Sequence, residues 1–250
     1  MLNHPTIEKL KALKLTGMVK AFDEQLQQTD ISDLTFEERL ALIVDREDIE
    51  RQNRRLQSRL KKAQLKQTAA FEDIDFKTPR GLDKALLMQL SNCEWVKAHN
   101  NILIVGPTGT GKTFLACALS HKACLEGYRS QYSRMPRLLP ELALAKGDGS
   151  YSKRLKELAK NEVLILDDWG LLNMTAEHRR DLLELLDDRH GNASTIVTSQ
   201  LPIKLWHESI QDDTLADAIL DRLLHNAYRI EMKGESMRKA RANLTRLEEK

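Results

Sequence analysis

The feature that most constrains this chain is an eight-residue stretch, Gly106-Pro107-Thr108-Gly109-Thr110-Gly111-Lys112-Thr113. It matches the pattern G-x-x-x-x-G-K-[ST] at every defined position. The apolar run Asn101–Val105 precedes it, as a buried parallel strand would, and the residues from Phe114 onward read as the first turns of a helix. A strand, a glycine-rich turn and a helix N-terminus together aim backbone N–H groups at a phosphate. The stretch therefore predicts a phosphate-binding loop.

The residue types within this loop predict separate roles. We expect Lys112 to reach the β- and γ-phosphates of a nucleotide and the Thr113 hydroxyl to bind Mg²⁺. Gly109 and Gly111 allow the backbone to approach a phosphate without an intervening Cβ. The predicted nucleotide contacts are the whole loop and the residue after it: Gly106, Pro107, Thr108, Gly109, Thr110, Gly111, Lys112, Thr113 and Phe114.

A second apolar run, Glu162–Leu166, ends in two carboxylates, Asp167 and Asp168. A strand that ends in acids and follows a phosphate-binding loop is typical of the second half of such a site. We expect Asp167 to lie beside the Mg²⁺, and Asp168 to lie where an attacking water is polarised. The alternative is a pair of acids that only terminates a buried strand.

A third strand is predicted at Ser194–Gln200, and it also ends in polar residues. The carboxyl ends of parallel strands lie on the ligand side of an α/β sheet. Either Ser199 or Gln200 is therefore a candidate to touch the γ-phosphate or the water, and a plain strand-end turn is the alternative. The alternation of strands and helical stretches predicts an α/β fold with a parallel sheet.

The N-terminal part of the chain reads as helical. One helix is predicted over residues 6–29, and a second begins at Thr35 with Glu38 completing a capping box. Seven cations and no acid lie between positions 51 and 67: Arg51, Arg54, Arg55, Arg59, Lys61, Lys62 and Lys66. A solvated helix face and contact with a nucleic-acid phosphate backbone are both consistent with this run.

Three segments follow from these patterns. Residues 1–67 are predicted to form a helical N-terminal domain for DNA or partner binding. Residues 68–80 form a linker whose aromatic residues can dock on the next domain, and residues 81–250 form the nucleotide-binding domain.

The composition is compatible with a folded α/β domain and argues against a membrane-spanning or secreted protein. The 250 residues are 41% hydrophobic and 30% charged, with a net charge of +2, so a core is possible and the charge balance alone does not indicate nucleic-acid binding. The three cysteines, Cys93, Cys117 and Cys124, are odd in number and lack metal-ligand spacing. No apolar run is long enough to span a membrane and the N-terminus does not read as a signal peptide. We expect a cytoplasmic protein without a membrane partner.

The motifs also indicate which nucleotide is bound and which reaction it undergoes. The tandem acids and the lack of an Asn-Lys-x-Asp stretch favour ATP over GTP. An ATPase and a small-molecule kinase use the same phosphate-binding parts. A kinase additionally needs a mobile lid and an acceptor pocket. This chain has instead a basic helical appendage and isolated arginines late in the core, which favours the ATPase.

Five stretches together resemble the IstB/DnaC family of AAA+ ATPases, which are related to the DnaA replication initiator. They are Gly106–Thr113, Asp167–Gly170, Val197–Gln200, Asp221–Leu223 and Gly234–Lys239. The similarity covers the whole chain and is greatest to IstB, the ATP-binding helper encoded with an insertion-sequence transposase. The replicative helicase loader DnaC is the nearest alternative.

The resemblance implies a P-loop AAA+ domain with a five-stranded parallel sheet in the order 5-1-4-3-2 and a short C-terminal helical lid. It places Lys112 and Thr113 on ATP and Mg²⁺, Asp167 on Mg²⁺, and Asp168 at the water. It further implies three catalytic positions: Ser199 as the first sensor, Arg222 as an arginine finger for a neighbouring subunit, and Arg238 as the second sensor. Asp168 replaces the usual Glu and Ser199 the usual Asn, which suits slow hydrolysis.

The resemblance also implies the partners. They are sequence-independent duplex DNA, a transposase, and further copies of the chain in an ATP-dependent ring or helical filament. A helical insertion over residues 134–160 is expected to face DNA and carries the cations Arg134, Arg137, Lys146, Lys153, Arg154 and Lys156. The chain shows no separate set of acids for cutting or joining strands, so we expect that chemistry to belong to the transposase.

Overall fold

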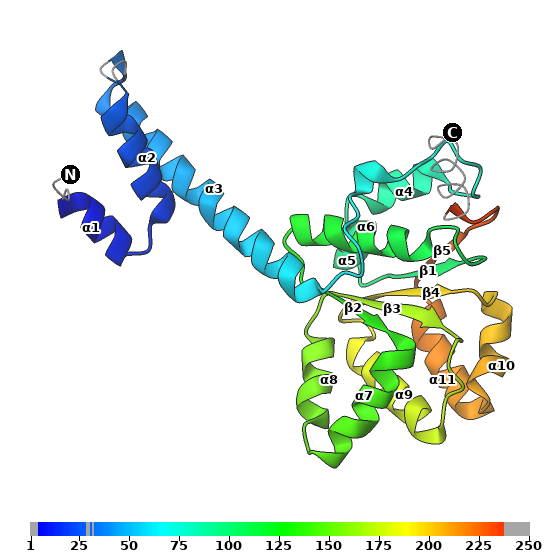
Figure 1. Ribbon diagram of the computed structural model, residues 1–250. Helices are drawn as coiled ribbons and strands as arrows, with labels where there is room; N and C mark the ends of the chain where they lie inside the picture. The colour runs from blue at the N-terminus through cyan, green and yellow to red at the C-terminus, as the bar shows by residue number, and fades with distance from the viewer. Residues whose placement is uncertain (1–4, 29–30, 32, 238–250) are drawn as a thin grey trace, which may run out of the picture. The chain divides into compact units, whose positions relative to one another are not determined.

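The structure is a computed structural model that describes residues 5–28, 31 and 33–237 of the 250-residue chain. The chain divides into two compact units, residues 1–58 and 59–250. The division falls inside one long helix, α3 (Phe36–Ala63), and therefore earlier than the boundary expected at residue 67. Figure 1 shows the elements in chain order.

The first unit begins with two short helices where the sequence predicts one. α1 (Pro5–Ala12) and α2 (Thr16–Gln27) are separated by Lys14, whose φ of 59° is left-handed. The apolar spacing resumes within a few residues, so periodicity alone does not reveal the break. Glycine or asparagine usually marks such a helix end, and a lysine there gives no signal. The predicted capping box is confirmed, since the Thr35 amide donates to Glu38 Oε2 at 2.8 Å and the Glu38 amide to Thr35 Oγ1 at 3.3 Å.

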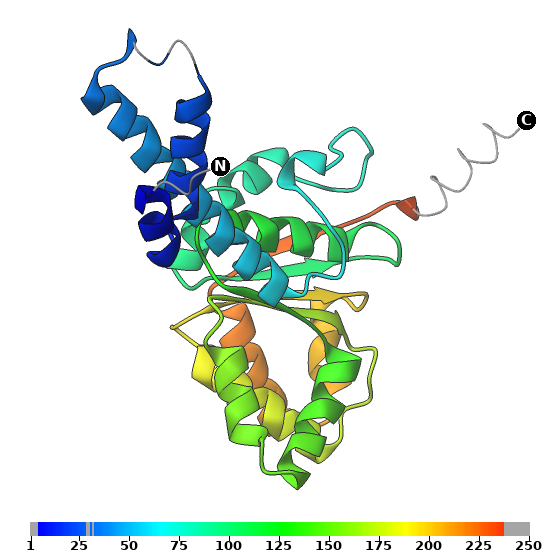
Figure 2. The ribbon, with the colours of Figure 1, turned by 60° about the vertical axis from the view of Figure 1, so that its left-hand side comes forward.

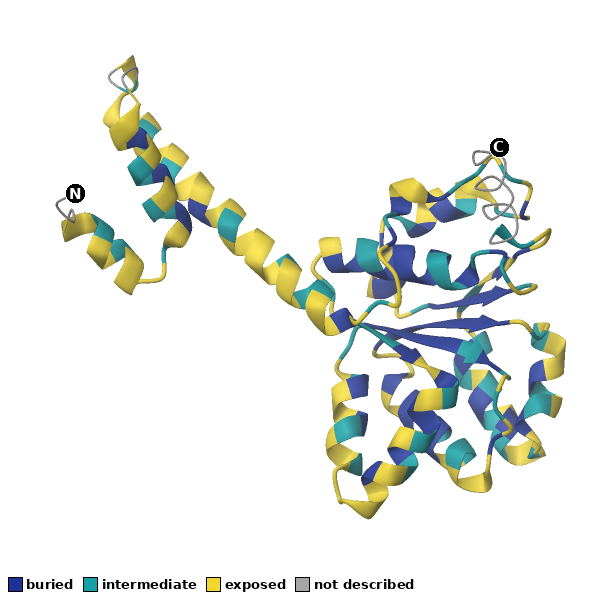
Figure 3. Ribbon diagram, in the orientation of Figure 1, coloured by how far each residue is buried: buried dark blue, intermediate teal, exposed yellow. Residues whose placement is uncertain are grey.

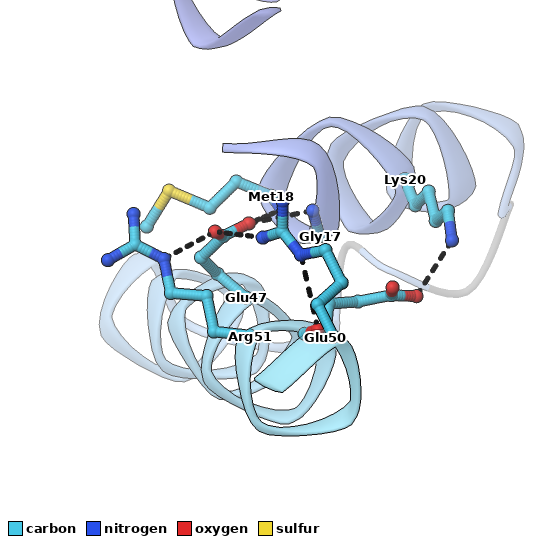
Figure 4. Close-up of polar contacts among 7 residues, drawn as sticks. Gly17, Met18, Lys20, Glu47, Glu50 and Arg51 are labelled. Carbon is cyan, nitrogen blue, oxygen red and sulfur yellow. Dashed lines mark hydrogen bonds and ion pairs between the residues drawn. The ribbon is translucent and has the colours of Figure 1, made fainter. Parts of the chain in front are cut away.

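A buried carboxylate joins α2 to α3 in this unit (Figure 4). Glu47 accepts hydrogen bonds from the amides of Gly17 at 2.7 Å and Met18 at 3.3 Å, at the first turn of α2. A Cβ on Gly17 would lie 2.6 Å from Glu47 Cα, so the two helices approach closely only because residue 17 is glycine. Glu47 Oε1 also accepts from Arg51 at 2.7 Å and from Arg54 at 3.2 Å. Burial alone would raise the pKa of Glu47, but the bonds from Arg51 and from the two amides outweigh it and lower this pKa.

The second unit is built on a five-stranded parallel sheet in the order β2-β3-β4-β1-β5. This is the expected order 5-1-4-3-2 read from the other edge, so the predicted α/β fold and topology are confirmed. The strands are β1 (Asn101–Val105), β2 (Ser130–Arg134), β3 (Val163–Trp169), β4 (Ser194–Ser199) and β5 (Ala227–Glu231). The residues of the three central strands β1, β3 and β4 are almost all buried, as Figure 3 shows, whereas the edge strands β2 and β5 are partly exposed.

Helices cover both faces of this sheet (Figures 1 and 2). On one face lie α4 (Lys84–Leu90), α5 (Glu94–Lys97) and α6 (Lys112–Leu125). On the other face lie α7 (Met135–Gly147), α8 (Tyr151–Ala159), α9 (Ala176–Arg189), α10 (Trp206–Ile210) and α11 (Asp213–Leu224). Two 3₁₀ turns, η2 (Phe71–Asp73) and η3 (Ile203–Leu205), complete the described elements.

The predicted linker docks on the first of these faces. Phe71 and Ile74 are buried in the same core cluster as α6, and Phe76 packs against it. Within the described residues, no helix has the length and apolar character needed to cross a membrane.

Candidate nucleotide-binding site

The predicted phosphate-binding loop lies between β1 and α6. Gly106, Gly109 and Gly111 have φ angles of 152°, 86° and 99°. A Cβ on Gly109 would lie 2.1 Å from Ser236 Oγ, and one on Gly106 would lie 2.3 Å from the Met232 carbonyl oxygen. The glycines therefore leave room for residues 232–236 to lie against the loop.

The loop borders a cavity of about 500 Å³ at the carboxyl ends of the strands. This volume lies within the usual range of ligand pockets. Thr108, Gly109, Gly111, Lys112, Thr113 and Phe114 line the cavity, while Gly106, Pro107 and Thr110 form the rest of the turn. The Lys112 ammonium donates to the carbonyls of Gly106 at 2.7 Å and Pro107 at 2.8 Å. The Lys112 ammonium thus lies within the turn of the loop, beside the cavity that this residue lines.

Asp167 is fully buried at the end of β3 and accepts three hydroxyl hydrogen bonds. Thr198 donates to Oδ1 at 2.5 Å, Thr113 to Oδ1 at 2.9 Å, and Tyr132 to Oδ2 at 2.6 Å. Burial alone would raise the pKa of Asp167, but the bonds from Thr198, Tyr132 and Thr113, helped by the charge of Lys66, hold this pKa below its usual value. The carboxylate is therefore ionised at neutral pH.

The donor set around Asp167 fits Mg²⁺. The Thr113 hydroxyl and the Asp167 carboxylate are adjacent, and both present the oxygen ligands that this ion prefers. The part of the chain that the structure describes contains no cluster of three or more His, Cys, Asp or Glu side chains suited to a metal. The usual Mg²⁺ site of nucleotide enzymes uses one or two protein oxygens together with phosphates and water, and Thr113 and Asp167 present such oxygens.

Asp168 also lines the cavity, but its carboxylate is held by an arginine. Arg134 Nε donates to Asp168 Oδ2 at 2.5 Å. The φ of Asp168 is 67°, a left-handed conformation that is uncommon for a residue with a side chain and that occurs at functional sites. The family resemblance implies that the 134–160 insertion faces DNA without singling out any one of its cations, and the structure places the Arg134 side chain at the nucleotide cavity.

The two candidate sensor residues at the end of β4 have different surroundings. The Ser199 hydroxyl is buried, donates to the Trp169 carbonyl at 2.9 Å and accepts from the Leu201 amide at 3.0 Å. Gln200 lines the cavity, and its Oε1 accepts from the Thr108 hydroxyl of the loop at 2.6 Å. The geometry thus favours Gln200 over Ser199 as the residue that faces a nucleotide.

Arg222 lies away from the phosphate-binding loop of its own chain. Its carbonyl accepts from the Asn101 amide group at 2.9 Å, at the start of β1, whereas the loop follows the end of β1. Its guanidinium pairs with Asp187 of α9 and donates to the Ala218 carbonyl at 2.7 Å. Arg238 lies outside the described residues.

The basic residues of the N-terminal stretch have different surroundings. Arg51 and Arg54 pair with Glu47, and Arg59 Nε donates to the Cys124 carbonyl at 2.9 Å. Arg55, Lys61 and Lys62 are exposed, whereas Lys66 lines the nucleotide cavity. In the insertion, Lys146 pairs with Asp181 and Glu177 and Arg154 with Glu157, while Arg137, Lys153 and Lys156 are exposed.

Three residues at the site carried no sequence signal for it, Lys66, Arg80 and Tyr132, and a fourth, Thr198, lies in one stretch of the family resemblance without a predicted role. Arg80 is buried and donates to the Thr110 carbonyl at 3.1 Å and to the Asp75 carbonyl, so the linker supports the loop. Tyr132 lies on a strand that no motif marks. Thr198 lies two residues before Gln200, and its inward direction follows from strand alternation once the strand end is known.

Comparisons with known proteins find relatives that are described as ATP-binding proteins. A family model described as IstB-like ATP binding protein matches residues 8–245. The protein y4pL of Sinorhizobium fredii, named as an insertion sequence ATP-binding protein, is 50% identical over 239 residues, or 96% of this chain and 98% of that protein.

Solved structures agree on the fold. The structure of DnaI superposes with a TM-score of 0.57 at 23% identity, covering 66% of this chain and 90% of that chain. The DnaC helicase loader gives 0.51 at 19% identity, covering 65% and 98%. The fold is therefore that of the AAA+ P-loop ATPases, and the chain belongs to the family of IstB-like ATP-binding proteins, as an ATPase.

Proposed function

We propose that this ATPase regulates DNA transposition by assembling head to tail on duplex DNA when ATP is bound. The assembly recruits or activates the transposase, and hydrolysis drives disassembly. The observation that carries the proposal is the position of Arg222, which lies near the start of β1 while the nucleotide cavity lies at its end. Because Arg222 lies near the opposite end of β1 from its own cavity, we expect it to contribute to the site of a neighbouring copy instead.

A contact of this kind makes assembly depend on ATP. The γ-phosphate attracts the guanidinium of the next protomer, and the same charge stabilises the transition state of phosphoryl transfer. The two surfaces that meet are different, so the contact is heterologous and produces a ring or a helical filament, depending on whether the rotation closes.

Each protomer supplies the remaining hydrolytic groups. Lys112 and the loop amides bind the phosphates, Asp168 orients the attacking water once it is released from Arg134, and Gln200 senses the γ-phosphate from the end of β4. Thr113 and Asp167 would hold Mg²⁺, which would supply positive charge to offset that of the phosphates. Exposed cations, among them Arg55, Lys61, Lys62, Arg137, Lys153 and Lys156, supply phosphate-backbone contacts that do not depend on base sequence.

A helicase loader is the alternative within the same fold. The names of the relatives refer to insertion sequences and support the transposition role, whereas DnaI and DnaC share only the fold with this chain. Pull-down with an insertion-sequence transposase and with the replicative helicase distinguishes the two functions. A small-molecule kinase would transfer phosphate to a metabolite and show no stimulation by DNA.

The central experiment is a salt titration of duplex DNA binding, with and without a slowly hydrolysed ATP analogue and Mg²⁺. We expect the analogue to strengthen binding at least about tenfold, and the logarithm of the binding constant to fall linearly with the logarithm of salt concentration. Sizing of the same samples should show large assemblies. A chain that stays monomeric with analogue, Mg²⁺ and duplex DNA contradicts the proposal.

Substitution of the two strand-end residues tests the sensor assignment. We expect Gln200→Ala to lower the hydrolysis rate about tenfold to a hundredfold, because it removes a group positioned at the γ-phosphate and the water. Ser199→Ala is the matched control, and it should affect thermal stability more than hydrolysis because the Ser199 hydroxyl bonds only to backbone groups in the described structure. Steady-state phosphate release at saturating ATP measures both. The reverse ranking would return the sensor role to Ser199.

A further inference from the structure

A lysine from the basic N-terminal stretch reaches into the nucleotide site. Lys66 lines the cavity, and its ammonium lies 3.4 Å from Asp167 Oδ2, forming an ion pair with the carboxylate that fits Mg²⁺. The Asp167 side chain is fully buried, whereas the Lys66 side chain is 47% exposed. The lysine thus has a route to solvent that the aspartate lacks.

The segment around Lys66 lies close to α6, the helix that follows the phosphate-binding loop. Arg59, in the last turns of α3, donates to the Cys124 carbonyl near the C-terminal end of α6 at 2.9 Å. Burial raises the pKa of the buried Cys117 thiol of α6, and the backbone N–H groups of Gln67 and Lys66 partly offset this by hydrogen bonding to it. Gln64, with a φ of 48°, makes the turn between α3 and this segment. Lys66 thus lies three residues after Ala63, the end of α3.

The charge at Asp167 explains why a cation is placed there. The three hydroxyl donors are neutral, so they satisfy the hydrogen bonds of the carboxylate without balancing its charge. A buried carboxylate without a cationic partner is costly. Thr113 approaches Oδ1, and Lys66 approaches Oδ2 from the cavity side. Two positive charges, an ammonium and a divalent ion, repel each other beside one carboxylate.

We propose that Lys66 is a resident counter-ion of Asp167 in the nucleotide-free protein, and that it leaves the carboxylate when nucleotide binds with Mg²⁺. The inference rests on the Mg²⁺ site of the proposed function and adds a regulatory role for this lysine. The release of Lys66 loosens residues 64–67, so the nucleotide state is transmitted to the end of α3. A second reading, in which Lys66 is a phosphate-binding lysine, predicts mutant effects of the opposite sign.

The test is a Mg²⁺ titration of the binding of a fluorescent ATP analogue to the full chain. We expect Lys66→Met to reach half-maximal binding at about two- to fivefold less Mg²⁺ than the wild type, the range set by the modest strength of a half-exposed ion pair. Lys66→Arg keeps the charge and should titrate close to the wild type. Lys97→Met is the matched control, because Lys97 is an exposed lysine that pairs with Glu94 and does not line the cavity.

Hydrogen–deuterium exchange on the same proteins supplies a readout that is independent of affinity. In the wild type, amides of residues 64–67 should exchange faster with Mg²⁺ and a slowly hydrolysed analogue than with the analogue and a chelator. In Lys66→Met they should already exchange fast with the chelator present.

The outcomes distinguish a failure of the proposed role of Lys66 from a failure of the proposed Mg²⁺ site. If Lys66→Met needs as much Mg²⁺ as the wild type, or more, or if its exchange pattern matches the wild type, the counter-ion role of Lys66 is wrong while the Mg²⁺ site stands. If Mg²⁺ does not change nucleotide binding or exchange in the wild type, the Mg²⁺ assignment of the proposed function fails, and the role of Lys66 fails with it.

Discussion

Replacing Lys112 with alanine is expected to lower ATP affinity about a hundredfold and to abolish ATP-dependent assembly on DNA. Hydrogen bonds to charged groups contribute about 1.5–3 kcal/mol each, and a loss of about 3 kcal/mol corresponds to that change in affinity. The Lys112 ammonium lies within the turn of the loop, at 2.7 Å and 2.8 Å from two of its carbonyl oxygens, and no other loop side chain carries a positive charge. Titration with a fluorescent ATP analogue measures the affinity, and sizing on duplex DNA measures the assembly.

The control for this variant is Lys97→Ala, which removes an exposed lysine away from the cavity. Thermal unfolding of both variants checks that the loop substitution has not unfolded the domain. Normal hydrolysis and normal DNA-dependent assembly by Lys112→Ala contradict the assignment of this loop as the site of ATP.

Replacing Arg222 with alanine is expected to leave nucleotide binding by the monomer within about twofold of the wild type, and to lower hydrolysis in the assembled state about a thousandfold or more. Arginine fingers act on the transition-state charge, so their loss affects the rate rather than the binding of ATP to an isolated protomer. Phosphate release in the presence of duplex DNA measures the rate.

Asp187→Ala is the matched control for Arg222→Ala, because Asp187 is the carboxylate that holds the Arg222 guanidinium within its own chain. A finger must leave this carboxylate to reach a neighbouring ATP, so Asp187→Ala should preserve the rate or raise it. If the pair is instead only structural, both substitutions should lower stability by similar amounts and neither should be specific to the assembled state.

Mixing the Arg222→Ala and Lys112→Ala proteins tests whether the arginine finger acts between subunits. Arg222→Ala retains a working phosphate-binding loop, and Lys112→Ala retains its arginine. A mixed assembly therefore contains sites that combine the loop of one with the arginine of the other. We expect the mixture to recover part of the wild-type rate although each variant alone is inactive. Normal hydrolysis by Arg222→Ala on DNA, or failure of all mixtures to recover activity, contradicts the assignment.

The two acids at the end of β3 have basic partners from different parts of the chain. Asp167 is held by three hydroxyls from three different elements and by Lys66, which follows α3. Asp168 is held by Arg134 at the end of β2. Both acids of the site are thus paired with basic side chains in the described structure, and the proposed function requires both pairs to change before hydrolysis.

Much of the site was determined by local sequence. The loop Gly106–Thr113 and the acids Asp167 and Asp168 are short continuous stretches, and their chemistry depends on residue type, strand direction and a helix start. The fold class and strand order were also correctly predicted, the order through the family resemblance. The division into segments 1–67, 68–80 and 81–250, and the role of each site residue, stay predictions.

Only the tertiary structure decided which distant side chains complete the site. Parallel pairing of β2 with β3 places Arg134 opposite Asp167 in register. The Arg134 guanidinium then pairs with Asp168, and the hydroxyl of Tyr132, also on β2, donates to Asp167. No spacing rule in a single sequence specifies that register, because it depends on how the sheet packs. The choice between Ser199 and Gln200 depended on which of two adjacent side chains points into the cavity. Lys66 belonged by sequence to a basic run, and only the turn at Gln64 and the packing on α6 bring its charge to Asp167.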